Sequence, residues 1–187
     1  FSTSCSFGDI NADGYPDLFV ANYFKEFYFE QALFGTHNLA ILNHYSINEE
    51  YEPGNDELYL NMGGKSFKNV SNFLKCNPGY GFGAVFTDVD NDNDLDIYLV
   101  NDFGENNEPN QILINQYPKL DFENKSKELK LNVGLKSMGV GVGDYNNDSY
   151  LDYHVTNIFA GPFMVNRGKD KSFVNLAPNI GTGINKI

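Results

Sequence analysis

Three observations in the sequence predict an all-β protein made of repeated units. Strand-forming aromatic residues are frequent, since the 187 residues include 16 Phe and 12 Tyr, and most of the chain lacks the apolar period of a helix. Three aspartate-rich windows recur, at residues 9–17, 88–96 and 144–152. Each window lies between two short runs that favour strands. We call these windows loop 1, loop 2 and loop 3.

Each repeat is predicted to contain four strands. A strand, a nine-residue loop and a second strand ending in Asn appear in "SFGDINADGYPDLFVANY", "VFTDVDNDNDLDIYLVND" and "GVGDYNNDSYLDYHVTNI". A second, less regular repeated segment follows each of these units, and we call it the second-hairpin segment. Its three copies are "DELYLNMGGKSFKNV", "NQILINQYPKLDFEN" and "GPFMVNRGKDKSFVNL". Each second-hairpin segment is typical of a hairpin whose turn contains Gly or Pro. Two hairpins per repeat give four strands.

Four-stranded units that recur roughly every fifty to sixty residues predict the blades of a β-propeller. We expect residues 1–187 to form one segment, with blades at about 1–72, 80–125 and 136–177 and the start of a further blade at 178–187. Calcium loops would join the first two strands of each blade. Propellers need roughly four to eight blades to close. The sequence therefore predicts a partial propeller, whose remaining blades belong to a longer chain.

An insertion at about 23–57 lengthens the first repeat. Its opening, "YFKEFYFEQALF", is compatible with a short amphipathic helix and concentrates aromatic residues that the blade does not require. Large exposed apolar patches usually mark contact sites. We therefore expect the insertion either to bind a protein or glycan partner or to fold over its own blade edge, and the sequence leaves both open.

Each loop is predicted to bind one Ca²⁺, giving up to three ions. Oxygen-bearing side chains stand at loop positions 1, 3, 5 and 9, and position 7 would offer its backbone carbonyl. Ca²⁺ takes six to eight oxygens at about 2.3–2.6 Å, whereas Mg²⁺ requires stricter geometry. Transition metals are disfavoured because the loops lack His and Cys. The predicted ligands are Asp9, Asn11, Asp13, Tyr15 and Asp17; Asp88, Asp90, Asp92, Asp94 and Asp96; and Asp144, Asn146, Asp148, Tyr150 and Asp152.

The chain reverses at position 6 of each loop, which predicts a positive φ there. Gly14 and Asn93 tolerate this conformation more readily than Ser149, so loop 3 matches the pattern least well. An EF-hand is excluded because its bidentate Glu at position 12 is replaced by an apolar residue in a strand pattern. A solvated Asp/Asn/Gly turn is the ordinary explanation of one such loop. It does not explain three loops in the same strand context.

These residues resemble the FG-GAP (VCBS-type) repeats of integrin α-subunit propellers. In that family a Phe-Gly or Gly-rich strand precedes the loop D-x-D-x-D-G-x-x-D, as in "YGFGAVFTDVDNDNDLDIYLV". With "NDELYLNMGGKSFKNV" and "SMGVGVGDYNNDSYLDYHVTN", the chain looks similar to the secreted group that includes cartilage acidic protein. The resemblance omits about 23–57 and 125–135, and Asn93 and Ser149 replace the loop glycine. It implies an extracellular, cell-surface or periplasmic protein that acts in adhesion or ligand binding.

The net charge and the motifs of the chain argue against several classes of function. A net charge of -12, without an obvious basic stripe, argues against nucleic acid as a partner. No apolar run reaches the roughly eighteen residues that would predict a membrane span. No Ser/His/Asp or Cys/His set stands out, so we expect a binding, adhesion or scaffold module and no enzyme. The alternative is a non-catalytic or face-forming propeller part of a larger secreted hydrolase or lyase.

The cysteines and one histidine are predicted to be structural. Cys5 occupies the position of Ala84 and Val140 in the later repeats, so we expect a buried free thiol, with a disulfide to Cys76 as the alternative. His154 stands where the other repeats have an aromatic residue. It is therefore predicted to be a core or blade-interface histidine.

Overall fold

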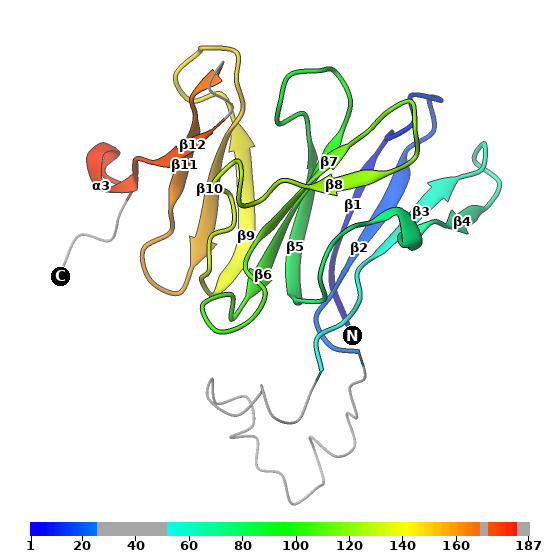
Figure 1. The fold of residues 1–187 in the computed structure, drawn as a ribbon, viewed down its shortest axis with the longest axis horizontal. Helices are drawn as coiled ribbons and strands as arrows, with labels where there is room; N and C mark the ends of the chain where they lie inside the picture. Colours follow the sequence, from blue (N-terminus) through cyan, green and yellow to red (C-terminus); the bar gives the residue numbers. More distant parts are fainter. Residues whose placement is uncertain (26–51, 169–171, 183–187) are drawn as a thin grey trace, which may run out of the picture.

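The computed structural model describes residues 1–25, 52–168 and 172–182 and contains three four-stranded antiparallel sheets (Figure 1). Each sheet takes four consecutive strands of the chain, in sequence order. The described residues contain little helical structure, chiefly η2 (Ser71–Phe73) and α3 (Ala177–Ile180). The prediction of an all-β chain with three four-stranded units is confirmed. We call these sheets blades A, B and C.

Each blade contains two hairpins. Blade A consists of β1 (Ser2–Gly8), β2 (Asp17–Asn22), β3 (Glu57–Asn61) and β4 (Phe67–Asn69). Blade B consists of β5 (Tyr80–Thr87), β6 (Asp96–Asp102), β7 (Gln111–Asn115) and β8 (Phe122–Asn124). Blade C consists of β9 (Ser137–Gly143), β10 (Asp152–Asn157), β11 (Phe163–Asn166) and β12 (Phe173–Asn175).

Strand register places the three loops equivalently. The residue before each loop pairs with the loop's ninth residue, in the pairs Gly8 with Asp17, Thr87 with Asp96 and Gly143 with Asp152. The loops therefore close the first hairpin of each blade at the same point. All three lie along one edge of the sheets, at the top of Figure 1.

Among the described residues, one large hydrophobic core lies between blades A and B and another between blades B and C. Successive residues of a strand point to opposite faces of the sheet. In β6, Ile97 and Leu99 therefore pack toward blade A, while Tyr98 and Val100 pack toward blade C. All seven residues of β6 are buried. Blade B is thus enclosed by described blades on both faces, so loop 2 has a described blade on each side.

The outer face of blade A is open to solvent among the described residues. Phe7 is 61% exposed and Phe67 is 47% exposed. The expectation that Cys5 is buried is wrong, because Cys5 is an exposed free thiol. Its counterpart Ala84 packs against the core between blades A and B, whereas no described blade covers the corresponding face of β1. Cys76 is also a free thiol in the structure and is half-buried.

His154 lies half-buried on the outer face of blade C. It alternates with Tyr153 and Val155, which both point into the core between blades B and C. The His154 ring centroid is 5.8 Å from that of Phe163, a residue of the same sheet. The histidine is therefore outside the described core, beside an aromatic side chain, and its predicted place at a blade interface stays a prediction.

The described ends of the insertion pack against the blades. Tyr23 and Phe24 are 8% and 5% exposed and form an aromatic cluster with Tyr80 and Phe103. The Tyr23 hydroxyl donates to Asp102 Oδ2 at 2.7 Å. These two aromatic residues fold over the protein's own edge. The predicted helix and most of the predicted partner surface lie outside the described residues.

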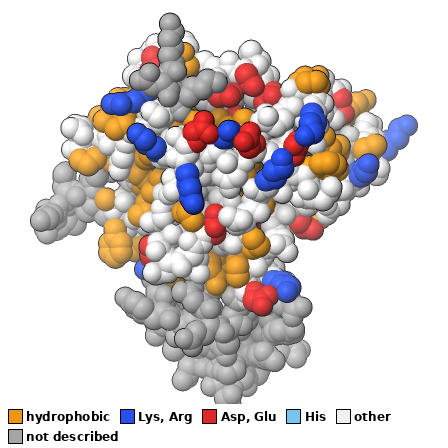
Figure 2. Space-filling model, viewed as in Figure 1, with side chains coloured by type: hydrophobic (Ala, Val, Ile, Leu, Met, Phe, Trp, Pro, Cys, Tyr) orange, Lys and Arg blue, Asp and Glu red, His pale blue; other side chains and the backbone are white. Residues whose placement is uncertain are grey.

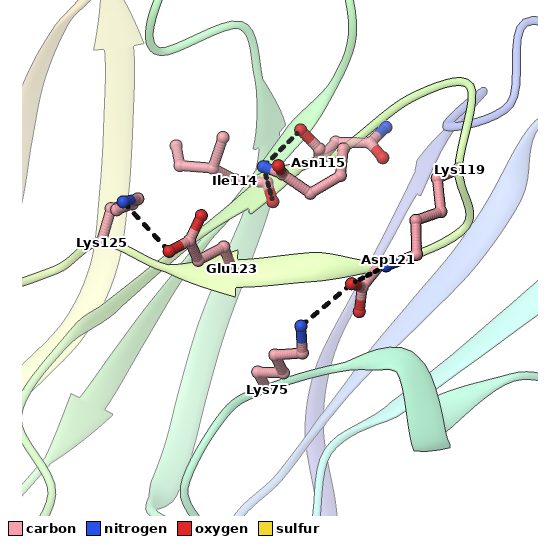
Figure 3. Close-up of polar contacts among 8 residues, drawn as sticks. Lys75, Ile114, Asn115, Lys119, Asp121, Glu123 and Lys125 are labelled. Atoms are coloured by element: carbon pink, nitrogen blue, oxygen red, sulfur yellow. Dashed lines mark hydrogen bonds and ion pairs between the residues drawn. The ribbon is translucent and has the colours of Figure 1, made fainter.

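Ion pairs cover the surface around β8. Asp121 pairs with Lys119 at 2.8 Å and with Lys75 at 2.9 Å, and these two lysines lower the pKa of Asp121 to about 2 (Figure 3). Lysines and acidic side chains are interspersed on this face (Figure 2). Exposed pairs of this kind contribute little to stability. In the part of the chain that the structure describes, no helix has the length and apolar character needed to span a bilayer.

Candidate metal centre

The three loops share a scaffold built around the aspartate at position 1. Its Oδ1 accepts a hydrogen bond from the backbone N–H of position 5, and its Oδ2 accepts one from position 6. In loop 2 the donors to Asp88 are Asp92 and Asn93, both at 3.1 Å. Loops 1 and 3 repeat both bonds at 2.8 to 3.1 Å. These side-chain to backbone bonds fold the chain around one carboxylate.

Two residues of each loop adopt a left-handed conformation. The positive φ predicted at position 6 is present in all three loops, at 87° for Gly14, 72° for Asn93 and 70° for Ser149. Position 4 also has a positive φ, which the sequence analysis did not predict, at 56° for Ala12, 60° for Asn91 and 58° for Asn147. L-residues pay a steric cost in this region. All three loops therefore have the same backbone conformation, although it is strained at their non-glycine residues.

The aspartate at position 9 fastens each loop to its blade. Asp96 is fully buried, and its two oxygens accept from the backbone N–H groups of Val89 and Asn115, both at 2.9 Å. Val89 is position 2 of loop 2, and Asn115 ends β7. Loops 1 and 3 have the same two bonds at 2.8 to 3.1 Å. A carboxylate oxygen has a second lone pair, so these bonds leave capacity for a metal ligand.

Loop 2 brings three carboxylates together. One oxygen each from Asp88, Asp90 and Asp96 lies within 4.8 Å of the other two. Two ligand oxygens on opposite sides of one Ca²⁺ are separated by about 5 Å, since each lies at about 2.3–2.6 Å from the ion. The three oxygens are thus close enough to share one ion. Within the described ranges, this is the one group of three His, Cys, Asp or Glu side chains found at such separations.

Negative charge is costly in loop 2. Burial raises the pKa of Asp96 to about 8, and burial followed by the Asp92 charge raises the pKa of Asp94 to about 6. Asp94 Oδ1 is buried and accepts no hydrogen bond from any described residue. A carboxylate in such a setting is stabilised by a cation. The orphaned oxygen and the raised pKa values therefore fit a divalent ion bound among these aspartates.

Loops 1 and 3 relieve the same repulsion with an amide. Asn11 Nδ2 donates to Asp13 Oδ2 at 3.0 Å, and Asn146 Nδ2 donates to Asp148 Oδ2 at 2.9 Å. Position 3 of loop 2 is Asp90, which has no such donor when ionised. Loops 1 and 3 keep oxygens at all the predicted positions, but their position 3 side chains are already used within the loop.

Position 7 is held alike in all three loops. The backbone N–H groups of Tyr15, Asp94 and Tyr150 donate to Oδ1 of the aspartate at position 5, at 2.9 to 3.1 Å. This bond fixes the peptide next to the carbonyl that the sequence analysis assigns as a ligand. Ligation by that carbonyl stays a prediction.

The asparagines that end the third strand of each blade were not predicted as site residues from the sequence. Asn61, Asn115 and Asn166 bond the position 9 carboxylates through their backbone N–H groups. The sequence contained an indication of their role, because all three second-hairpin segments have Asn at the end of their first strand. Figure 3 shows Asn115 at the end of β7, next to Ile114.

Comparison with known protein families supports the repeat pattern. The model of the FG-GAP-like repeat matches residues 45–99 and residues 88–155. Loop 2 lies within both matches, and loop 3 lies within the second. Together the two matches cover more than half of the chain. A search of the curated proteins found no match to this chain.

Proposed function

Because the chain belongs to the FG-GAP-like repeat family, we propose that it is a calcium-binding β-propeller module in which Ca²⁺ has a structural role. The carboxylate oxygens of Asp88, Asp90 and Asp96 carry this proposal, since they lie within 4.8 Å of one another in a loop whose charge is poorly neutralised. The ion would clamp the first hairpin of blade B. Loops 1 and 3 would act in the same way on blades A and C.

The module serves extracellular binding, adhesion or scaffolding and has no catalytic activity of its own. Extracellular modules bind Ca²⁺ with dissociation constants of about 10⁻⁴–10⁻³ M, which suits loops that combine carboxylates with amides. Secretion, and membership of the group that includes cartilage acidic protein, are parts of this proposal. Its support is the acidic loop set on a repeated all-β scaffold.

Calcium titration tests the metal proposal. After chelation and dialysis, calorimetry should detect up to three Ca²⁺ per chain, and excess calcium should raise the thermal midpoint by about 5–10 °C. Asp88→Ala should remove binding at loop 2. Asp121→Ala is the matched control, because it removes one carboxylate just before β8, outside all three loops. A native chain that shows no binding heat and an unchanged midpoint would refute calcium binding.

We place the partner surface on the insertion, and its described ends allow a clean deletion. Lys25 N–H donates to the Glu52 carbonyl at 3.0 Å, so the two ends are adjacent. Replacing residues 26–51 by a short Gly-Ser link should preserve the calcium-dependent midpoint and abolish binding to a protein or glycan ligand of the native chain. Loss of calcium-dependent folding in the deletion variant would assign the insertion a role in blade stability instead.

A further inference from the structure

One asparagine in blade B connects two loops of different blades. Asn115 Nδ2 donates to the carbonyl of Ile10 at 2.8 Å, and Ile10 is position 2 of loop 1. The backbone N–H of Asn115 donates to Asp96 Oδ1, position 9 of loop 2, at 2.9 Å. Asn115 is 3% exposed, so water competes little for either bond. This residue therefore ties loop 1 to loop 2.

Asn166 repeats the connection at the next junction. Its Nδ2 donates to the carbonyl of Val89, position 2 of loop 2, at 3.3 Å. Its backbone N–H donates to Asp152 Oδ1, position 9 of loop 3, at 2.8 Å. Val89 N–H in turn donates to Asp96. Hydrogen bonds thus run without a break from loop 1 through loop 2 to loop 3.

Loops 2 and 3 also have a direct contact. Asn91 Nδ2, at position 4 of loop 2, donates to the carbonyl of Ser149, at position 6 of loop 3, at 3.0 Å. Both residues are exposed, so this bond competes with water and is weaker than the buried ones. It nevertheless joins the same two loops as Asn166.

Blade A contains a natural control for these contacts. Asn61 aligns with Asn115, and its backbone N–H donates to Asp17 Oδ1 at 2.8 Å. Its Nδ2 donates to the Pro16 carbonyl, within its own loop, at 3.0 Å. No described loop precedes loop 1. Asn61 therefore makes the contacts within its own blade and lacks the contact between blades.

We propose that Asn115 and Asn166 couple the loops, so that Ca²⁺ fills neighbouring sites cooperatively. This inference rests on the proposed calcium binding. An ion in loop 1 fixes positions 1 and 3, which flank Ile10, and so fixes the carbonyl that Asn115 bonds. Asn115 is then held in the orientation that places its N–H against Asp96. The second ion meets a loop that is already ordered, and it loses less conformational entropy on binding.

The coupling is reciprocal and modest. Binding free energies are linked, so loop 2 must favour loop 1 by the same factor as loop 1 favours loop 2. A neutral buried hydrogen bond corresponds to about a two- to tenfold change in an equilibrium constant. We therefore expect this range for the coupling through Asn115. The longer bond of Asn166 should contribute a smaller factor, to which the Asn91–Ser149 bond adds at the same junction.

Calorimetric titration of loop-deficient variants tests the coupling. Asp13→Ala impairs loop 1 without touching Asn115. In the native background it should weaken calcium binding at the remaining sites about two- to tenfold. In an Asn115→Ala background it should leave the remaining sites unaffected. In the matched Asn61→Ala background, the weakening should persist, since Asn61 makes no contact with another loop.

Each alternative outcome has a defined meaning. Calcium binding that stays unaffected by Asp13→Ala in the native background overturns the coupling and leaves the calcium function standing. Equal behaviour of the Asn115→Ala and Asn61→Ala backgrounds also overturns it. Absence of any binding overturns both proposals. If Asn115→Ala fails to fold, Asp148→Ala combined with Asn166→Ala poses the same question at the junction of loops 2 and 3.

Discussion

Loop 2 and the two outer loops have the same backbone but different charge. All three curl around the position 1 carboxylate, and all three are fastened by a buried aspartate at position 9. They differ at positions 3 and 7, where loop 2 has Asp90 and Asp94 and the outer loops have Asn and Tyr. The shared residues set the geometry of the loop. The variable residues set how strongly that geometry depends on a cation.

The amide at position 3 reduces the repulsion between carboxylates in the outer loops without a bound ion. Asn11 and Asn146 each donate to the carboxylate at position 5, so one attraction replaces one repulsion. The ionised Asp90 of loop 2 cannot donate such a bond, and Asp94 Oδ1 is buried without a hydrogen-bond donor among the described residues. We therefore expect ion removal to act mainly through loop 2, in the blade that has described blades on both faces.

Removing the buried anchor of loop 2 should have the largest effect. Asp96→Ala leaves two buried N–H groups, of Val89 and Asn115, without their acceptor. Each buried unsatisfied donor costs about 1–3 kcal/mol, so we expect a loss of about 4 kcal/mol in urea unfolding with calcium present. Asp17→Ala at the outer blade should cost less, because fewer neighbours enclose loop 1. Equal losses for the two variants would contradict the comparison.

A rise in pH should have opposite effects on the stability of the calcium-free protein and of the calcium-loaded protein. The folded pKa values of about 8 for Asp96 and about 6 for Asp94 lie above the unfolded value of about 3.9. A carboxyl with a raised pKa stabilises the folded state fully at low pH, and this contribution is lost as pH rises through the folded pKa. The chelated protein should therefore lose stability between pH 5 and pH 8, on the order of 2 kcal/mol.

The calcium-loaded protein should show the reverse trend, because protons compete with the ion for the same oxygens. Thermal unfolding at pH 5, 6, 7 and 8, in calcium and in chelator, measures both trends. Parallel pH profiles in the two conditions would show that the loop 2 aspartates do not share the ion.

The repeated parts of the fold, the hairpins and their loops, could be predicted from the sequence. Spacing from Asp9, Asp88 and Asp144 located the hairpins, and the need for a reversal predicted the positive φ at position 6. These features are local, because they depend on residues within one loop. The left-handed Ala12 at position 4 was missed because alanine gives no propensity signal for that conformation.

Contacts between blades could not be predicted from the sequence. Asn115 was unremarkable in its strand, since its role depends on Ile10, which lies 105 residues away in the chain. Cys5 was misassigned for the same reason. Its strand pattern matched that of Ala84, but burial depends on whether another blade covers that face of the sheet. Periodicity indicates which face a residue occupies and gives no information on what packs against it.

Exchanging position 3 should convert one type of loop into the other. Asp90→Asn gives loop 2 an amide that can donate to Asp92, as Asn11 donates to Asp13, and it removes one charge. We expect the calcium-free protein to gain about 1 kcal/mol in urea unfolding. Calcium affinity at loop 2 should fall about tenfold, because an ionised ligand is replaced by a neutral one.

The reciprocal variant, Asn11→Asp, is the control for this exchange. It should destabilise the calcium-free protein by a similar amount and tighten calcium binding at loop 1. Calorimetry and urea unfolding in chelator measure both changes. If the two variants shift stability in the same direction, charge at position 3 is not what distinguishes the loops.

The smallest effect should come from relieving strain in loop 3. Ser149 has a φ of 70°, in a conformation that Gly14 adopts in loop 1 with a φ of 87°. Ser149→Gly removes a steric cost of about 1–2 kcal/mol, while glycine adds entropy to the unfolded chain that offsets about half of it. The net gain is about 0.5 kcal/mol, and it should be equal in calcium and in chelator, because the Ser149 side chain is no predicted ligand. Gly14→Ser should cause a similar loss at loop 1. A gain seen only with calcium would instead mean that position 6 limits ion binding, and loop 3 would then differ from loop 1 in affinity as well as in strain.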